Sequence, residues 1–180
     1  MKRIAIQGIQ GSYSEEAVRE MFGADASVLE CSDFDSTFAA IESGEADKAV
    51  IPVRNKIVGA IQPARDLLDS STFRVLERLR LRVRHVLAGA PRATFDDLVS
   101  VRSHVEALKQ CRKFLGANPQ LTQSIGADTA SSIKATVEQK DLTRAAIGSR
   151  RAAELYGAEI IRENIADDID NWTMFYLIGN

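Results

Sequence analysis

The residues best suited to chemistry on a carboxylate follow a short apolar run. Arg54, Asn55 and Lys56 come directly after the run 49–53, which predicts a buried strand. Open α/β sheets place their ligands at the carboxyl ends of such strands, and two cations with an amide suit a substrate that carries carboxylates. The same three residues are equally typical of a solvated loop, so the pattern alone leaves both interpretations open.

Two further segments could contact a ligand. Residues 8–14 form a turn between a predicted strand at 4–6 and a helix that Ser12 or Ser14 could cap, and the backbone N–H groups of this turn could hold a carboxylate or phosphate. The turn lacks the glycine spacing of a dinucleotide site. Residues 171–175 place an amide and a hydroxyl between aromatic side chains, which could contact a ligand, but on spacing alone an ordinary strand start is the better explanation.

Other polar residues favour structural roles. Arg78, Arg80, Arg82 and Arg84 alternate with apolar residues, which predicts a strand with one arginine-rich face. Such a face could bind phosphates, but a solvated sheet face or a subunit contact is the commoner case. His85 is expected to be structural, and His104 begins a helix as a cap neighbour or as the wall of a cleft. We find no Ser-His-Asp order and no catalytic carboxylate pair.

Composition excludes several classes of protein. Lys and Arg number 23 against 25 Asp and Glu, a formal charge of −2, and this balance argues against a general nucleic-acid binder. The two cysteines, Cys31 and Cys111, build neither a disulfide framework nor a metal knuckle, and two histidines make a zinc site improbable. No apolar run suits a membrane span or a signal peptide, so we expect a soluble cytoplasmic protein.

The order of predicted elements indicates two similar α/β lobes. Strands and helices alternate through residues 4–70 and again through residues 98–161, which is typical of mainly parallel sheets with covering helices. We expect residues 1–76 with 162–180 to form the first lobe and residues 77–161 to form the second. A central cleft between the lobes is where a ligand would bind.

Several segments of the chain match the motifs of a known family. In order, they are residues 8–14 (Gly-Pro-x-Gly-Thr-Phe-Ser), 52–59 (Pro-Ile-Glu-Asn-Ser/Thr-x-x-Gly), 81–87 (Leu-x-Ile-x-His-x-Leu), 103–111 (Ser-His-Pro-x-Ala-Leu-x-Gln-Cys), 128–130, 145–147 and 171–175 (Asn-x-Thr-Arg-Phe). Along nearly its whole length the chain thus resembles the catalytic domain of the prephenate dehydratase family. The order and the compatible spacing of these matches make the resemblance specific.

The resemblance implies a two-lobed domain of the type II periplasmic-binding-protein kind that converts prephenate to phenylpyruvate in phenylalanine biosynthesis. It implies no metal or cofactor, and a homodimer. We expect the regulatory ACT domain that usually follows in this family to be absent, because the sequence ends at Asn180. The charge balance and the lack of a long apolar run predict no nucleic-acid or membrane partner. Thr173 would assist departure of the ring hydroxyl, with Asn55 as the second catalytic residue. The implied substrate-binding residues are Gly11, Ser12, Tyr13, Ser14, Arg54, Lys56, Ser103, His104, Thr129 and Phe175.

Three positions depart from the family pattern. Arg54 replaces a glutamate, Lys56 replaces serine or threonine, and Met174 replaces the arginine of Thr-Arg-Phe. Together they raise the formal charge of these motifs by two units, enough to alter affinities and pKa values in a partly dehydrated site. A dianionic substrate would still be accommodated, and Arg54 could take over the contact of the missing arginine.

These departures leave other functions open beside a dehydratase. One is a prephenate decarboxylase of specialised metabolism that does not aromatise the ring, so that its product keeps the ring hydroxyl. Another is a non-catalytic protein that binds an aromatic acid without turnover. Nucleic-acid binding through the arginine strand is the weakest alternative and would show a strong dependence on salt.

Overall fold

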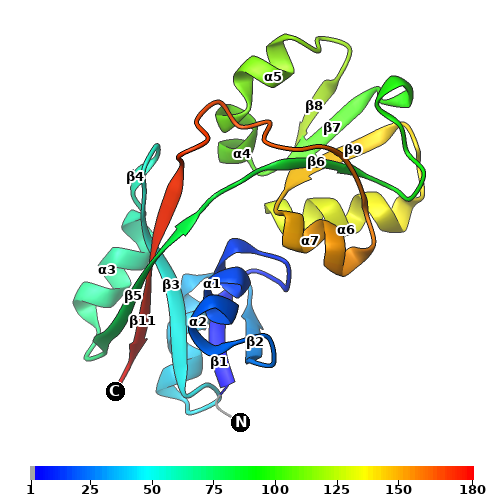
Figure 1. The fold of residues 1–180 in the computed structure, drawn as a ribbon. Coiled ribbons are helices and arrows are strands. Elements are labelled where there is room, and N and C mark those ends of the chain that lie inside the picture. Colours follow the sequence, from blue (N-terminus) through cyan, green and yellow to red (C-terminus); the bar gives the residue numbers. More distant parts are fainter. Residues whose placement is uncertain (1–2) are drawn as a thin grey trace. The chain divides into compact units, whose positions relative to one another are not determined.

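Two separate β-sheets organise the chain in the computed structural model, which describes residues 3–180 (Figure 1). Each sheet belongs to its own unit: the first unit runs to Val83 and resumes at Asn171, and the second unit spans Arg84–Asp170. Both units combine strands with helices, so the predicted α/β class with two lobes is confirmed.

The first unit contains the strands β1 (Arg3–Gln7), β2 (Ser27–Cys31), β3 (Lys48–Asn55), β4 (Gly59–Ala60), β5 (Arg74–Arg82) and β11 (Trp172–Gly179), and the helices α1 (Tyr13–Phe22), α2 (Phe34–Glu42) and α3 (Gln62–Ser70). Local sequence explains where the helices begin. Ser12 and Asp33 accept backbone N–H groups as the N-caps of α1 and α2, and Pro63 occupies the first turn of α3.

Strand order in the first sheet is β2-β1-β3-β11-β5, with β4 paired to β3. β1 runs parallel to β2 and β3, whereas β11 runs antiparallel to both β3 and β5. The sheet is therefore mixed, although the sequence predicted a mainly parallel one. The antiparallel pairs arise because β5 leaves this unit and β11 returns to it.

The two faces of β11 pack against different helices. Phe175 and Leu177 lie in an apolar cluster with residues of α1. Met174 and Tyr176 lie in a second cluster with residues of α2 and α3. Side chains alternate along a strand, so β11 divides the first unit into two sides, which we call the α1 face and the α3 face.

The second unit contains the strands β6 (Val86–Gly89), β7 (Ser100–Ser103), β8 (Thr122–Ile125), β9 (Arg144–Gly148) and β10 (Glu159–Arg162), the helices α4 (Val105–Gln110), α5 (Arg112–Gly116), α6 (Thr129–Gln139) and α7 (Arg150–Tyr156), and a 3-10 turn at Phe95–Asp97. Its strand order is β10-β6-β9-β7-β8. β7 is parallel to β8 and β9, whereas β6 is antiparallel to β9 and β10, so this sheet is also mixed.

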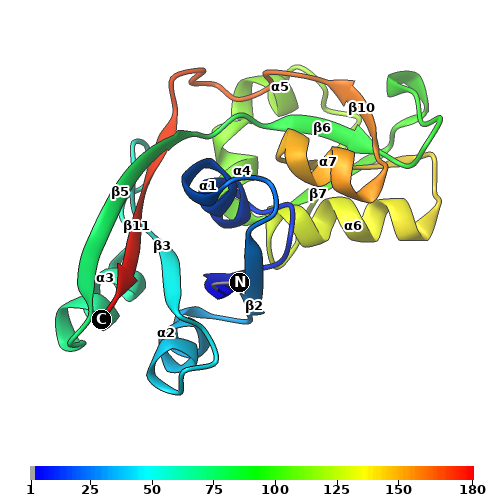
Figure 2. The same cartoon turned by 60° about the horizontal axis from the view of Figure 1, so that its bottom comes forward.

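Helices cover both faces of the second sheet. α6 and α7 lie side by side along one face (Figure 2). Residues of α4 and α5, among them Leu108 and Leu115, pack against the strand residues Leu87, Val101 and Ile147 in the core on the other face. Within residues 3–180 no helix is both long enough and apolar enough to cross a membrane.

The chain passes between the units later than the sequence boundaries suggest. All of β5 pairs with β11, so the arginine-rich strand is an edge strand of the first sheet and not a connection into the second unit. β10 pairs with β6, and the segment after it stays in the second unit, where the Ile165 N–H donates to the carbonyl of His85 at 3.3 Å. The crossings therefore fall after Val83 and after Asp170.

His85 is part of the core of the second unit, as the sequence indicated. Its side chain is 2% exposed, and its Nε2 lies 2.8 Å from Oε1 of Gln110. Burial lowers the pKa of His85 below the ordinary value of 6.5, although the hydrogen bond to Gln110 opposes that shift. The imidazole is therefore neutral in the folded protein at neutral pH.

This burial predicts that stability falls on mild acidification. Below the unfolded pKa of 6.5 the unfolded chain takes up a proton that the folded chain cannot accept, so the free energy of unfolding decreases by up to about 1.4 kcal/mol per pH unit. Urea unfolding at about pH 7.5 and about pH 5.5 measures the loss. His85→Gln should remove most of it. An equal loss in that variant would show that other groups are responsible.

Candidate active site

Three segments that lie far apart in the sequence reach the same edge of the first sheet (Figure 1). β1 and β3 are parallel, so the turn after Gln7 and the loop after Asn55 lie at that edge. β11 is antiparallel to β3, so it begins there, with Trp172 and Thr173. The topology thus brings together the three segments that the sequence singled out in this unit.

One extra residue in β3 determines which side chain lies opposite Thr173. The pairing of β3 with β11 shifts by one residue at Val53, which forms a β-bulge. Beyond the bulge, Met174 pairs with Arg54 and Thr173 pairs with Asn55. A bulge re-aims the residues that follow it, and here it places Asn55 beside Thr173 on the α1 face.

Hydrogen bonds fix the orientation of the Asn55 amide. Its Oδ1 accepts from the backbone N–H groups of Ile57 at 2.9 Å and Val58 at 3.1 Å. Backbone N–H groups can only donate, so the oxygen must face them and Nδ2 must face the other way. Nδ2 lies within hydrogen-bond distance of three oxygens: Thr173 Oγ1 at 3.0 Å, Trp172 O at 3.0 Å and Asn171 Oδ1 at 3.1 Å.

This orientation makes the Thr173 hydroxyl a donor. Because the Asn55 amide can only donate to Oγ1, the hydroxyl proton points to another acceptor. Within residues 3–180 no acceptor for that proton is recorded. Asn55 is 6% exposed and Thr173 is 7% exposed, so the pair lies largely outside bulk water, where hydrogen bonds are stronger. The arrangement can donate to an oxygen atom of a bound molecule.

The turn before α1 is held by side chains of its own unit. The Gly11 N–H donates to Oε2 of Glu15 at 2.8 Å, and the Gln10 N–H donates to Oε1 of Glu30 at 2.7 Å. Glu15 is 1% exposed and also pairs with Arg19. Two carboxylates of the chain therefore occupy donors that the sequence offered to a ligand, and these N–H groups stabilise the turn.

Four more predicted residues of the first unit lie on the α1 face or at its edge. The Ser12 hydroxyl accepts the Glu15 N–H at 3.3 Å as the N-cap of α1. Ser14 is buried within the first turn of α1, and Tyr13 packs against the apolar cluster of that face. Phe175 is 2% exposed and belongs to the same cluster, so it supports the strand beneath Thr173.

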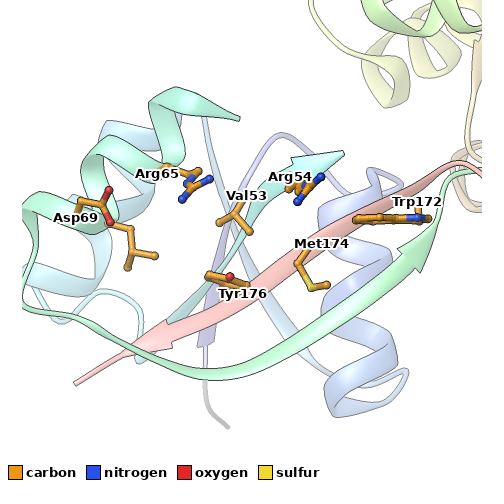
Figure 3. Close-up of a pocket in the computed structure, with 8 residues that line it drawn as sticks. Val53, Arg54, Arg65, Asp69, Trp172, Met174 and Tyr176 are labelled. Atoms are coloured by element: carbon orange, nitrogen blue, oxygen red, sulfur yellow. The ribbon is translucent and has the colours of Figure 1, made fainter. Parts of the chain in front are cut away.

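Arg54 and Met174, two of the three departures from the family pattern, lie on the other side of the sheet. They are cross-strand neighbours on the α3 face and line a pocket there with Val53 and Tyr176 (Figure 3). The structure therefore does not bring Arg54 together with Thr173. Lys56, the third departure, is exposed in the β3–β4 loop, and its N–H donates to the Trp172 carbonyl at 2.9 Å.

The predicted residues of the second unit gather at the carboxyl end of parallel strands. Ser103 ends β7, but its hydroxyl is buried and donates to the Ile147 carbonyl at 2.7 Å. His104 is the N-cap of α4, where Nδ1 accepts the Glu106 N–H at 3.3 Å. Thr129 is the first residue of α6 and is half-buried.

Sequence reasoning missed three features of this site. Asn171 was noted only as part of a motif, yet it is fully buried and its carbonyl accepts the Val83 N–H at 3.0 Å, which anchors the start of β11. Glu15 gives no sequence signal of its contact with the turn, because acidic residues are common in the first turn of a helix. The bulge at Val53 has no sequence signal, because it depends on the partner strand.

Comparison with known proteins agrees with the motif matches. The family model described as prephenate dehydratase matches residues 4–180. Arogenate dehydratase/prephenate dehydratase 1 of Arabidopsis thaliana is 36% identical over 98% of this chain and 45% of its own length, so the chain spans about half of that relative.

Two solved structures share the fold over 99% of the chain. Prephenate dehydratase from Arthrobacter aurescens, solved in complex with L-Phe, has a TM-score of 0.91 at 26% identity, and 60% of that chain is covered. A protein described as GqqA, a novel type of quorum quenching acylase, has a TM-score of 0.89 at 31% identity, and 64% of that chain is covered.

We predict that Asn55→Ala destabilises the protein by about 2 kcal/mol, because the fully buried Asn171 loses the amide hydrogen bond to its Oδ1 and the loop N–H groups of Ile57 and Val58 lose their acceptor. Urea unfolding measures the change. The matched control is Gln123→Ala at an exposed position of β8, expected within about 0.5 kcal/mol of the parent protein. Equal stability of the two variants would contradict the role of Asn55.

A second prediction concerns residues 54 and 174. Met174→Arg places a guanidinium between its cross-strand neighbours Arg54 and Arg80, so it should destabilise the protein by about 0.5–1 kcal/mol. In the Arg54→Glu background the same substitution should be neutral or stabilising, because opposite charges then face each other. Strictly additive effects in the double-mutant cycle would show that the two side chains do not interact.

Proposed function

Since the chain belongs to the prephenate dehydratase family, we propose that it converts prephenate to phenylpyruvate. In this reaction the ring carboxylate leaves as carbon dioxide, and its bonding electrons enter the ring. The ring carbon–oxygen bond breaks, and the departing hydroxide takes a proton to leave as water. Electrons balance within the substrate, so the reaction needs no redox cofactor.

One observation carries the proposal: the Thr173 hydroxyl accepts a hydrogen bond from Asn55 and keeps its own proton to donate. Negative charge develops on the ring oxygen as its bond to carbon breaks. A fixed donor at that oxygen stabilises the charge most where water is excluded. In this proposal Thr173 is the catalytic residue. Asn55 acts through Thr173 and is a positioning residue.

The same contact argues against a nucleophilic role for Thr173. A nucleophilic hydroxyl needs a neighbouring base that takes its proton. Asn55 supplies an N–H donor to Oγ1, which is the opposite arrangement. We therefore favour a dehydratase over an acylase, despite the likeness to GqqA.

Substrate binding uses the charged and polar groups near the strand ends. We propose two contacts from the first unit: Lys56, which follows Asn55 in the sequence, and Ser12, in the turn after β1. Ser103, His104 and Thr129 remain predicted contacts from the second unit. Arogenate is a second candidate substrate, because the Arabidopsis relative is named for both activities and arogenate loses the same two groups.

The test is incubation of the purified protein with prephenate, and separately with arogenate, at neutral pH, with products followed by NMR. Phenylpyruvate formed well above the protein-free rate supports the proposal. If phenylalanine forms from arogenate and prephenate is not converted, arogenate is the substrate in place of prephenate. A product that keeps the ring hydroxyl, or binding without turnover, would contradict it.

We predict that Thr173→Val lowers kcat at least about 100-fold, because the donor to the departing oxygen is lost. Thr173→Ser keeps the hydroxyl and should retain most of the activity. Thr122→Val, at an exposed position of β8, is the matched control and should be fully active. Normal turnover by Thr173→Val would rule out the assigned role.

A further inference from the structure

The α3 face carries a pocket that the proposed reaction does not use. Its volume is about 290 Å³, and it lies between α3 and the strands β3 and β11 (Figure 3). The lining residues are Val53, Arg54, Arg65, Leu68, Asp69, Trp172, Met174 and Tyr176. All of them belong to the first unit. Thr173 and Asn55 lie on the opposite face of the same strands.

The charges around this pocket are not neutralised by the protein itself. Arg54 and Arg65 both line it, and within residues 3–180 neither guanidinium has a recorded ion pair or hydrogen bond. The one acidic lining residue, Asp69, lies at the far end of the pocket from Trp172 (Figure 3). Two guanidinium groups beside one carboxylate leave a net positive charge that suits a carboxylate ligand.

The other side of the pocket is aromatic and apolar. Trp172, Met174 and Tyr176 form it, in an unbroken alternation along β11. Two further arginines lie over these rings: Arg80 is 5.6 Å from the Trp172 ring centroid, and Arg78 is 5.1 Å from that of Tyr176. These cation–π contacts hold the rings in place, so the surface is prepared for a flat apolar group.

We propose that this pocket binds a small aromatic carboxylate. The carboxylate lies against Arg54 and Arg65, and the ring packs on Trp172 and Met174. A pocket of about 290 Å³ is at the small end of ligand sites, which favours a single-ring molecule over a nucleotide or a peptide. The proposal does not depend on the proposed function, because it uses a different face of the sheet.

Two sources share this chemistry: an aromatic 2-oxo acid and an aromatic α-amino acid. Asp69 distinguishes them, since its carboxylate can pair with an ammonium group but repels a second carboxylate. An amino acid would therefore place its ammonium toward Asp69. Asp69→Asn should weaken binding of the amino acid and leave binding of a simple carboxylate unchanged or slightly tighter.

Trp172 is the single tryptophan of the chain, so its fluorescence reports on the pocket. The probes are 3-phenylpropionate, L-phenylalanine and the neutral 3-phenylpropan-1-ol. We expect a saturable change with at least one of the two carboxylates and binding weaker by about tenfold for the alcohol. Arg65→Gln should weaken binding of the carboxylate by about tenfold. The control Arg112→Gln, at an exposed position of α5, should leave that binding unchanged.

Thr173→Val separates this pocket from the candidate active site, because Trp172 neighbours both. Binding that persists in Thr173→Val and weakens in Arg65→Gln supports the proposal. Binding that is lost in Thr173→Val and unchanged in Arg65→Gln overturns it. The absence of a saturable fluorescence change with either carboxylate also overturns it. A fluorescence change that depends on protein concentration alone overturns it as well, because it would show that a second copy of the chain covers the pocket.

Discussion

The extra residue in β3 is the constraint on which the candidate active site depends. Without the bulge at Val53, the regular pairing of β3 with β11 would place Arg54 opposite Thr173 and would turn Asn55 toward the α3 face. With it, Asn55 shares a face with Thr173, and Arg54 shares the other face with Met174. A shift of one residue thus assigns a neutral donor to one side of the sheet and a cation to the other.

The hydrogen bonds around Asn55 determine which atom of its amide faces Thr173. The loop N–H groups of Ile57 and Val58 can only donate, so they fix the amide oxygen, and the amide nitrogen must then donate to Thr173. The direction of the Thr173 hydroxyl is therefore set through Asn55 by backbone groups of the β3–β4 loop. Phe175 and the α1 cluster hold the strand below, so the donor rests on a rigid element.

Much of this could be predicted from the sequence, for identifiable reasons. The motifs at 52–59 and 171–175 pointed to Asn55 and Thr173, and the period of two over residues 78–84 identified the arginine-rich strand. The bulge could not be found, because it is a property of two paired strands. The role of Glu15 was also hidden, since a carboxylate in the first turn of a helix is common whether or not it binds the preceding turn. Because the bulge cannot be seen in the sequence, the charge change at Arg54 and Met174 looked like a change of the active site, although the two side chains lie on the α3 face.

A double-mutant cycle on kcat tests the central claim, that Asn55 acts through the Thr173 hydroxyl. Turnover of prephenate is measured for the parent protein, Asn55→Ala, Thr173→Val and the double variant, at a temperature where all four are folded. If Asn55 acts only through Thr173, the double variant is no slower than Thr173→Val alone. Losses that multiply would contradict the account, because they would show that Asn55 contributes to the reaction independently of Thr173.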